Sequence, residues 1–184
     1  MDKGWSEKNK EIQKLLTKEV SFDEAIKKLV DFRAELFEEI TQLVNTYPEK
    51  AFAEMPFARA KGYHSKSLAY SIWHIFRIED IVAHEMIAGD SQVLFDGDFL
   101  KRIGSPIITT GNELQGDGIY EFSKQLNVKE KLIRSKCVDE DENAFWLIDY
   151  WCGKDVKGLI QMPFSRHWIM HIEAMRRIRN KWTF

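Results

Sequence analysis

Apolar residues recur every three or four positions along most of the chain, which is the spacing of amphipathic helices. The first such stretch covers residues 6–18 and is short. In the second, Ser21 followed by Glu24 three positions later indicates a capping box at a helix start, and we expect the helix to end before Pro48. This helix repeats its apolar residues at Phe22, Ile26, Leu29, Phe32, Leu36, Ile40 and Leu43.

The same spacing predicts more helices further along the chain. One covers residues 65–88 and is closed by Gly89. The irregular stretch 90–118 is too long for a tight turn, so we expect it to cross the molecule and to shape a site. Helical spacing resumes at residue 119 and passes through Leu132 and Ile133. A short apolar helix over 144–151 and a last helix from about 155 to 181 complete the pattern, with Pro163 marking a kink or a late start.

Four long helices joined with one long crossover predict an all-α fold, a four-helix bundle with extra short helices. The chain has 184 residues and no internal repeat, so we expect a single domain over 1–184.

Composition limits the partners and the compartment that we expect. The net charge is −2, so neither nucleic acid nor an anionic membrane surface is an expected partner. No apolar run approaches the roughly 20 residues needed to span a bilayer, and the first residues are too polar for a secretory signal. Cys137 and Cys152 are the only cysteines, which indicates a reducing compartment and no disulfide framework. We therefore predict a cytoplasmic protein.

The stretch SRHWIMHIEAMRRI places His167 and His171 four residues apart near the end of the chain. On a helical wheel both lie in the middle of the apolar face of the last helix. Two imidazoles on a core face are costly unless their nitrogens find partners, and one metal ion would satisfy a nitrogen of each. Ordinary hydrogen-bonded core histidines are the alternative, and this geometry alone leaves both interpretations open.

A metal would need a third ligand, and three histidines remain. His64 lies at the end of a connection, and His84 shares a helix face with Asp80, which favours a solvated residue. His74 lies at the edge of an apolar face near the middle of its helix and is the preferred candidate. Glu79 lies inside the same apolar face, either as a partner for a buried arginine or backbone donor or as a group that supports the metal ligands.

Other catalytic patterns are missing. No Glu-x-x-His occurs, which argues against a di-iron carboxylate bundle. His84-Glu85 starts a zinc-protease motif, but position 88 is alanine where the second histidine would be.

Three stretches together, SIWHIFRIEDIVAHEMI, TTGNEL and FWLIDYWCGKDVKGLIQMPFSRHWIMHIEAMRRI, resemble the DinB-like superfamily of metal-dependent helical bundles. The resemblance covers about residues 21–181 and implies an up-down-down-up bundle. It also implies a metal site of His74, His167 and His171. The chain departs from the family at Ala174, where many relatives carry glutamine.

The resemblance further implies an enzyme that holds one divalent ion, zinc or nickel, and that acts as a transferase, isomerase or hydrolase-like enzyme with a low-molecular-weight thiol. Three imidazoles leave an open position on such an ion, which is typical of catalytic rather than structural sites. A homodimer is expected because bundles of this kind pair through helix faces and the chain has six tryptophans. The alternative function is a non-enzymatic, stress-related binding protein that uses its helical surface.

Overall fold

The structure is a computed structural model that describes residues 2–128 and 161–182. Within these ranges the chain is helical and contains no strand, which confirms the predicted all-α class. The α-helices are α1 (Lys3–Leu16), α2 (Phe22–Thr46), α3 (Leu68–Asp80), α4 (Phe99–Arg102), α5 (Asp117–Gln125) and α8 (His167–Trp182). Two segments are π-helical, Ile81–Ala88 and Met162–Arg166, and the 3-10 turns include Gly62–Ser65 and Val93–Phe95.

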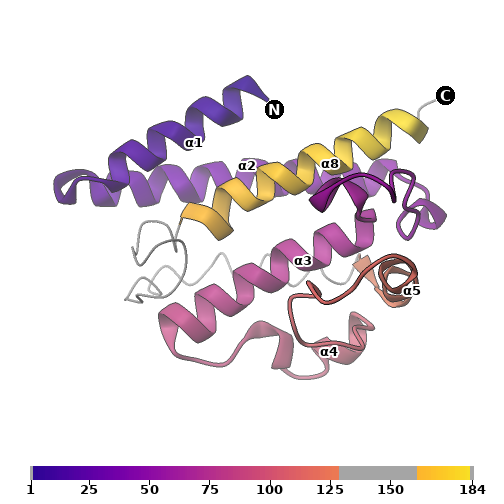
Figure 1. The fold of residues 1–184 in the computed structure, drawn as a ribbon. Coiled ribbons are helices and arrows are strands. Elements are labelled where there is room, and N and C mark those ends of the chain that lie inside the picture. Colours follow the sequence, from indigo (N-terminus) through magenta and orange to yellow (C-terminus); the bar gives the residue numbers. More distant parts are fainter. Residues whose placement is uncertain (1, 129–160, 183–184) are drawn as a thin grey trace.

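Helix α8 lies between α2 and α3 and packs against both (Figure 1). It runs in the same direction as α2 and opposite to α3. Helix α1 covers α2, and α5 packs against α3. The 3-10 turn Gly62–Ser65, which precedes α3, also packs against α8. The connection that leads into α3 and the last helix are therefore brought together at one place.

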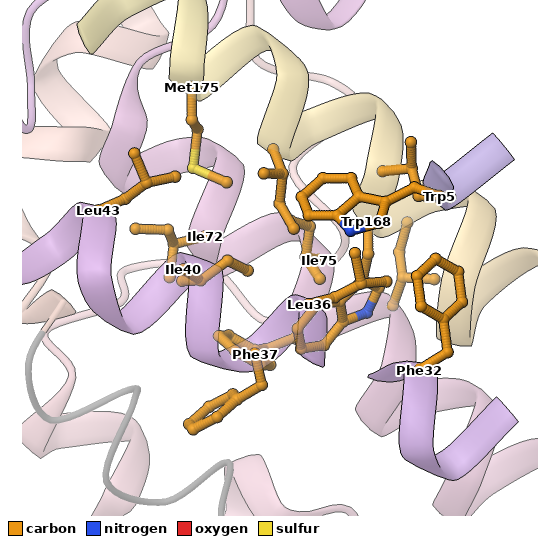
Figure 2. Close-up of a cluster of buried hydrophobic side chains, with 14 of the residues drawn as sticks. Trp5, Phe32, Leu36, Phe37, Ile40, Leu43, Ile72, Ile75, Trp168 and Met175 are labelled. Atoms are coloured by element: carbon orange, nitrogen blue, oxygen red, sulfur yellow. The ribbon is translucent and has the colours of Figure 1, made fainter. Parts of the chain in front are cut away.

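Burial of the apolar faces holds these helices in place (Figure 2). The predicted face of α2 is buried at its centre, and it meets Trp168 and Met175 of α8 and Ile72 and Ile75 of α3. A second cluster lies under the connection between α3 and α5 and consists of Tyr70, Trp73, Leu94, Phe99, Ile103, Ile119 and Phe122. Trp73 thus anchors the long irregular stretch to α3.

A buried ion pair joins α2 to α3. The guanidinium of Arg33 donates from Nε to Glu79 Oε1 at 2.6 Å and from Nη2 to Glu79 Oε2 at 2.9 Å. The same guanidinium lies 4.8 Å from the ring centre of Trp168. The interpretation of Glu79 as the partner of a buried arginine is therefore confirmed.

The start of α2 differs from the sequence prediction. Ser21 is the N-cap residue, but its hydroxyl caps no N–H of α2. Instead, Ser21 Oγ donates to the carbonyls of Leu15 at 2.7 Å and Lys18 at 3.2 Å, because the chain turns back on α1 there. The predicted capping box was therefore wrong in mechanism, although the position of the helix start was correct.

The other boundaries differ by a few residues. Helix α3 begins after Ser67, whose hydroxyl accepts from Tyr70 N, and Gly89 ends the following π-helical segment with a φ of 68°. Gln161 is already helical, and Pro163 lies inside the π-helical segment that follows it. The prediction that the last helix could start late, at Pro163, was therefore wrong. Helix α5 stops at Gln125, because Leu126 is extended and packs into the core.

Several predictions fall on residues 129–160, outside the described residues. They include the helical spacing around Leu132, the short helix over 144–151, the start near residue 155 and both cysteines. Among the described helices, none combines the length and apolar character needed to cross a bilayer.

Candidate metal centre

His74 of α3 and His167 and His171 of α8 come together between the two helices. One ring nitrogen from each lies within 4.8 Å of the others. The ring centres are 5.0 Å apart for His74 and His167, 5.2 Å for His74 and His171, and 4.7 Å for His167 and His171. The three histidines selected from the sequence therefore form one cluster.

All three rings are buried and are held neutral. Their exposed fractions are 5% for His74, 8% for His167 and 3% for His171. Burial lowers the pKa of His167 to about 3, with a smaller contribution from His74. Burial also lowers the pKa of His74, and it holds the pKa of His171 well below the usual range. Neutral imidazole is the form that binds metal ions.

The orientation of His74 is set by one hydrogen bond. Its Nδ1 lies 2.6 Å from the carbonyl oxygen of Thr110. A carbonyl only accepts, so Nδ1 carries the proton and Nε2 is the nitrogen left for a metal. The ring of Tyr70 stacks on that of His74, with 5.3 Å between ring centres and 18° between planes. A ligand ring fixed from two sides is typical of metal-binding histidines.

The Thr110 carbonyl is in turn positioned by Gly111. This glycine has a φ of 74°, and its carbonyl accepts from the Tyr70 hydroxyl at 3.1 Å. A Cβ at this position would lie 2.8 Å from Cζ3 of Trp73. Only glycine allows the chain to lie this close to α3 in this conformation.

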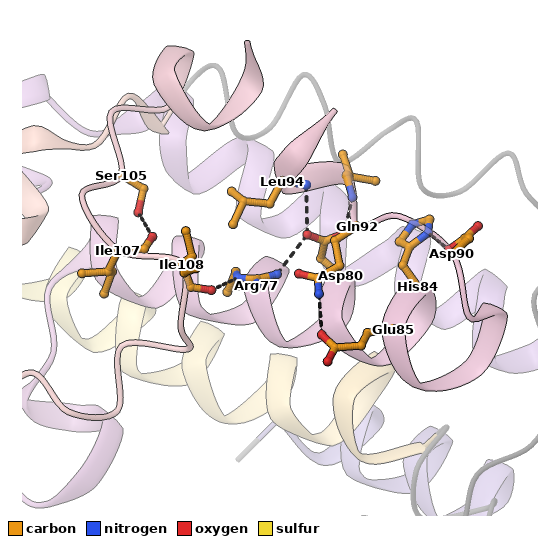
Figure 3. A network of polar contacts seen from close by, with 11 residues as sticks. Arg77, Asp80, His84, Glu85, Asp90, Gln92, Leu94, Ser105, Ile107 and Ile108 are labelled. Carbon is orange, nitrogen blue, oxygen red and sulfur yellow. Dashed lines mark hydrogen bonds and ion pairs between the residues drawn. The ribbon is translucent and has the colours of Figure 1, made fainter. Parts of the chain in front are cut away.

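A buried polar network ties the rest of the irregular stretch to α3 (Figure 3). Arg77 Nε donates to the Ile108 carbonyl at 2.8 Å, and Arg77 Nη1 donates to Asp80 Oδ2 at 3.1 Å. The Asp80 carboxylate also accepts the backbone N–H of Val93 at 2.8 Å and of Leu94 at 3.1 Å. This stretch therefore supplies the carbonyl that orients His74 in the candidate site.

Two ring nitrogens of the cluster bear on whether a metal ion fits there. Nδ1 of His167 and Nδ1 of His171 are buried and have no hydrogen-bond partner in the described part of the chain. Buried polar atoms in this state are costly, and a metal bond or a proton donor would relieve that cost. In a tetrahedral zinc site with bonds of about 2.0–2.1 Å, ligand nitrogens lie about 3.3 Å apart. The three ring nitrogens lie within 4.8 Å of one another and would have to move closer together to reach that spacing. With that movement, the residues fit a divalent ion.

The three imidazole nitrogens limit which metal ions this site could bind. Imidazole nitrogens suit zinc, nickel, copper and iron, whereas calcium and magnesium require oxygen ligands. Among residues 2–128 and 161–182, this is the one group of three or more histidine, cysteine or carboxylate side chains that comes this close together. The cluster could hold a transition-metal ion, and it contains no carboxylate.

The two remaining histidines lie outside the cluster. His84 Nδ1 lies 2.7 Å from Asp90 Oδ1, and the Asp80 carboxylate is used by Arg77 and the backbone. His84 was expected to be a solvated residue on the helix face of Asp80, and the structure pairs it with Asp90 instead. The ring of His64 lies against that of Tyr63, with ring centres 4.5 Å apart and planes tilted by 44°.

Sequence reasoning missed the residues that support the cluster. Thr110, Gly111 and Arg77 act through the fold of an irregular stretch, which helical periodicity does not describe. The one available signal was the glycine after two threonines in TTGNEL, because a glycine in that context indicates a close backbone approach.

Comparison with protein-family models and with curated proteins finds no match for this chain. The class of protein is therefore described from the fold and the candidate site alone. In its described residues, this is an all-helical protein with a buried three-histidine group that could hold a metal ion.

Proposed function

We propose that the chain is a metal-dependent enzyme whose ion is held by His74, His167 and His171. The observation that carries the proposal is the convergence of three buried, neutral imidazoles from two helices, two of them with unpaired Nδ1 atoms. Three protein ligands and no carboxylate match the arrangement of catalytic sites, which keep an open position. Zinc or nickel is the proposed metal.

A bound ion would act as a Lewis acid and lower the pKa of a thiol or water that enters the open position. The chain's own residues do the remaining work. The Thr110 carbonyl holds the proton on Nδ1 of His74, which keeps Nε2 basic and directed to the ion. Tyr70 and Tyr63 pack against His74 and His171, respectively, and keep bulk water from the rings.

We further propose that the fold is the up-down-down-up bundle of the DinB-like superfamily. The directions of α2, α3 and α8 agree with the first, second and fourth helices of such a bundle, which supports this assignment. By the same resemblance, the proposed reaction is transfer or isomerisation with a low-molecular-weight thiol, by a cytoplasmic homodimer.

Metal content tests the proposal directly. Protein purified without strong chelators should contain about one divalent ion per chain by elemental analysis. The double variant His167→Ala/His171→Ala should contain none, whereas His84→Ala, a histidine outside the cluster, should keep the wild-type content. Metal retained by the double variant would show that these residues are not the ligands.

A second assay separates an enzyme from a binding protein. The loaded chain should accelerate transfer of a small thiol to an electrophile, and removal of the metal should abolish the acceleration. Full metal content without metal-dependent activity toward any thiol would favour the non-enzymatic helical binding protein.

A further inference from the structure

Lys66 lies next to Tyr70, whose ring stacks on His74 of the histidine cluster. Its Nζ lies 4.8 Å from the ring centre of Tyr70, and that ring stacks on His74. Lys66, Tyr70 and His74 are spaced four residues apart, with Lys66 directly before Ser67, the N-cap of α3. Lys66 has an extended backbone outside α3, and its side chain reaches the ring of Tyr70 in the first turn of that helix.

The three-histidine group contains no carboxylate, and the Lys66 ammonium contacts the tyrosine ring that stacks on His74. A divalent ion bound by three neutral rings would add two more positive charges, so the loaded site needs an anion.

Lys66 itself has no carboxylate partner in residues 2–128 and 161–182. Its hydrogen bond is a long one, from Nζ to the carbonyl of Leu114 at 3.5 Å. Glu113 acts on Tyr70, but its carboxylate accepts the Thr109 hydroxyl. Partial burial lowers the pKa of Lys66, which shows that its ammonium lacks full solvation. A half-buried ammonium that has no carboxylate partner among the described residues is suited to bind an anionic group of a ligand.

We propose that the substrate of this site carries a carboxylate and that Lys66 binds it beside the metal. This inference rests on the proposed function. One lysine without a neighbouring arginine fork matches a singly charged group better than a phosphate, and the Leu114 carbonyl would repel a second negative charge. A carboxylate on Lys66 and a donor group on the ion would hold the ligand at two points.

Cobalt-substituted protein provides the test, because its visible spectrum reports ligand binding without any assay of activity. The probes are mercaptoacetate, which has a thiol and a carboxylate, and 2-mercaptoethanol, which has the same thiol without the charge. Lys66→Met should weaken mercaptoacetate binding roughly tenfold, the effect of one partly exposed charge pair. Binding of 2-mercaptoethanol should not change, and Lys66→Arg should retain most of the affinity for mercaptoacetate.

Lys61→Met is the matched control. Lys61 is exposed on the same connection, so its loss removes the same charge away from the site and should leave both affinities at the wild-type value. Equal affinities of wild type and Lys66→Met for mercaptoacetate would overturn the inference alone. An equal loss for both thiols would overturn it too, because Lys66 would then support the metal site rather than the substrate. Failure of the wild-type chain to bind cobalt would overturn the proposed function and this inference with it. Thermal midpoints within a few degrees of wild type confirm that each variant is folded, and Lys66→Gln replaces Lys66→Met if the latter is not.

Discussion

At the residue scale, the three histidines are polar groups that the fold places where solvation is poor. Each ring has less than a tenth of its surface exposed, and His167 and His171 each keep a buried nitrogen without a partner. Stability elsewhere in the core must offset this cost when no metal is bound. The arrangement is understandable if the histidines are retained for binding rather than for packing.

The low pKa of His167 leads to a prediction for the metal-free chain. Because its pKa is about 3 in the folded state and about 6.5 when unfolded, the unfolded chain binds more protons between these values. The free energy of unfolding should therefore fall as pH drops below about 6.5, by up to about 1.4 kcal/mol per pH unit from this residue alone. Urea unfolding with chelator at pH 7, 6 and 5 measures the slope.

His167→Gln supplies the comparison for that slope. It lacks the titrating ring, so its stability should depend less steeply on pH than that of wild type over the same range. Parallel curves for the two proteins would show that His167 titrates alike in the folded and unfolded chains.

Glu79 allows a prediction for the buried ion pair. Glu79→Ala leaves the Arg33 guanidinium buried without its bidentate carboxylate, and breaking a buried pair from one side costs about 3–5 kcal/mol. Glu121→Ala removes an exposed carboxylate 3.3 Å from Lys124 and should cost less than about 1 kcal/mol. Chemical denaturation measures both, and similar losses for the two variants would contradict the role of the buried pair.

At the scale of elements, the irregular stretch after α3 behaves as part of the site. Arg77 and Asp80 make three hydrogen bonds to it, one from Arg77 to the Ile108 carbonyl and two from the backbone N–H groups of Val93 and Leu94 to Asp80. Gly111 lets the chain approach Trp73. The stretch reaches His74 directly through the hydrogen bond to the Thr110 carbonyl and indirectly through Gly111 and Tyr70.

Gly111→Ala should therefore damage both stability and metal affinity. The substitution adds a Cβ at a φ of 74°, which costs about 1–2 kcal/mol, and places it 2.8 Å from Trp73, which costs about 1–3 kcal/mol more. Gly97→Ala is the matched control, because Gly97 also has a positive φ of 52° but faces open space. Denaturation and metal titration compare the two, and equal effects would show that the contact with Trp73 is unimportant.

The helices could be predicted from the sequence because burial follows their periodicity. The face of α2 from Leu29 to Leu43 and the inward positions of His167 and His171 are direct results of the 3.6-residue repeat. His74 could be selected by the same reasoning. The sequence could not predict the hydroxyl contacts of Ser21 or the pairing of His84 with Asp90, because each depends on how the chain turns after a helix ends. The Thr110 carbonyl could not be predicted for the same reason.

At the scale of the whole molecule, oligomeric state stays a prediction. We expect a homodimer, and light scattering at tens of micromolar should give twice the mass of the 21.7 kDa chain. The mass of a single chain at that concentration would contradict the expectation.

The metal should also contribute to the stability of the whole fold. His167 and His171 belong to one helix, so an ion held by these two alone would add little to tertiary stability. With His74 as a third ligand, an ion would join α3 to α8, two elements that otherwise meet through apolar contacts such as Ile72 and Ile75 against Met175. An ion that binds the folded chain and not the unfolded chain raises the free energy of unfolding by about 2.7 kcal/mol at 100 times its dissociation constant.

His74→Ala should remove most of this dependence. We expect added zinc or nickel to raise the thermal midpoint of wild type by several degrees and to leave that of His74→Ala nearly unchanged. His84→Ala, a histidine in the π-helical segment that continues α3, should respond to metal as wild type does. Scanning calorimetry with and without metal provides the measurement. An equal rise in wild type and His74→Ala would remove His74 from the site and make His64 the next candidate, because the turn that carries His64 packs against α8.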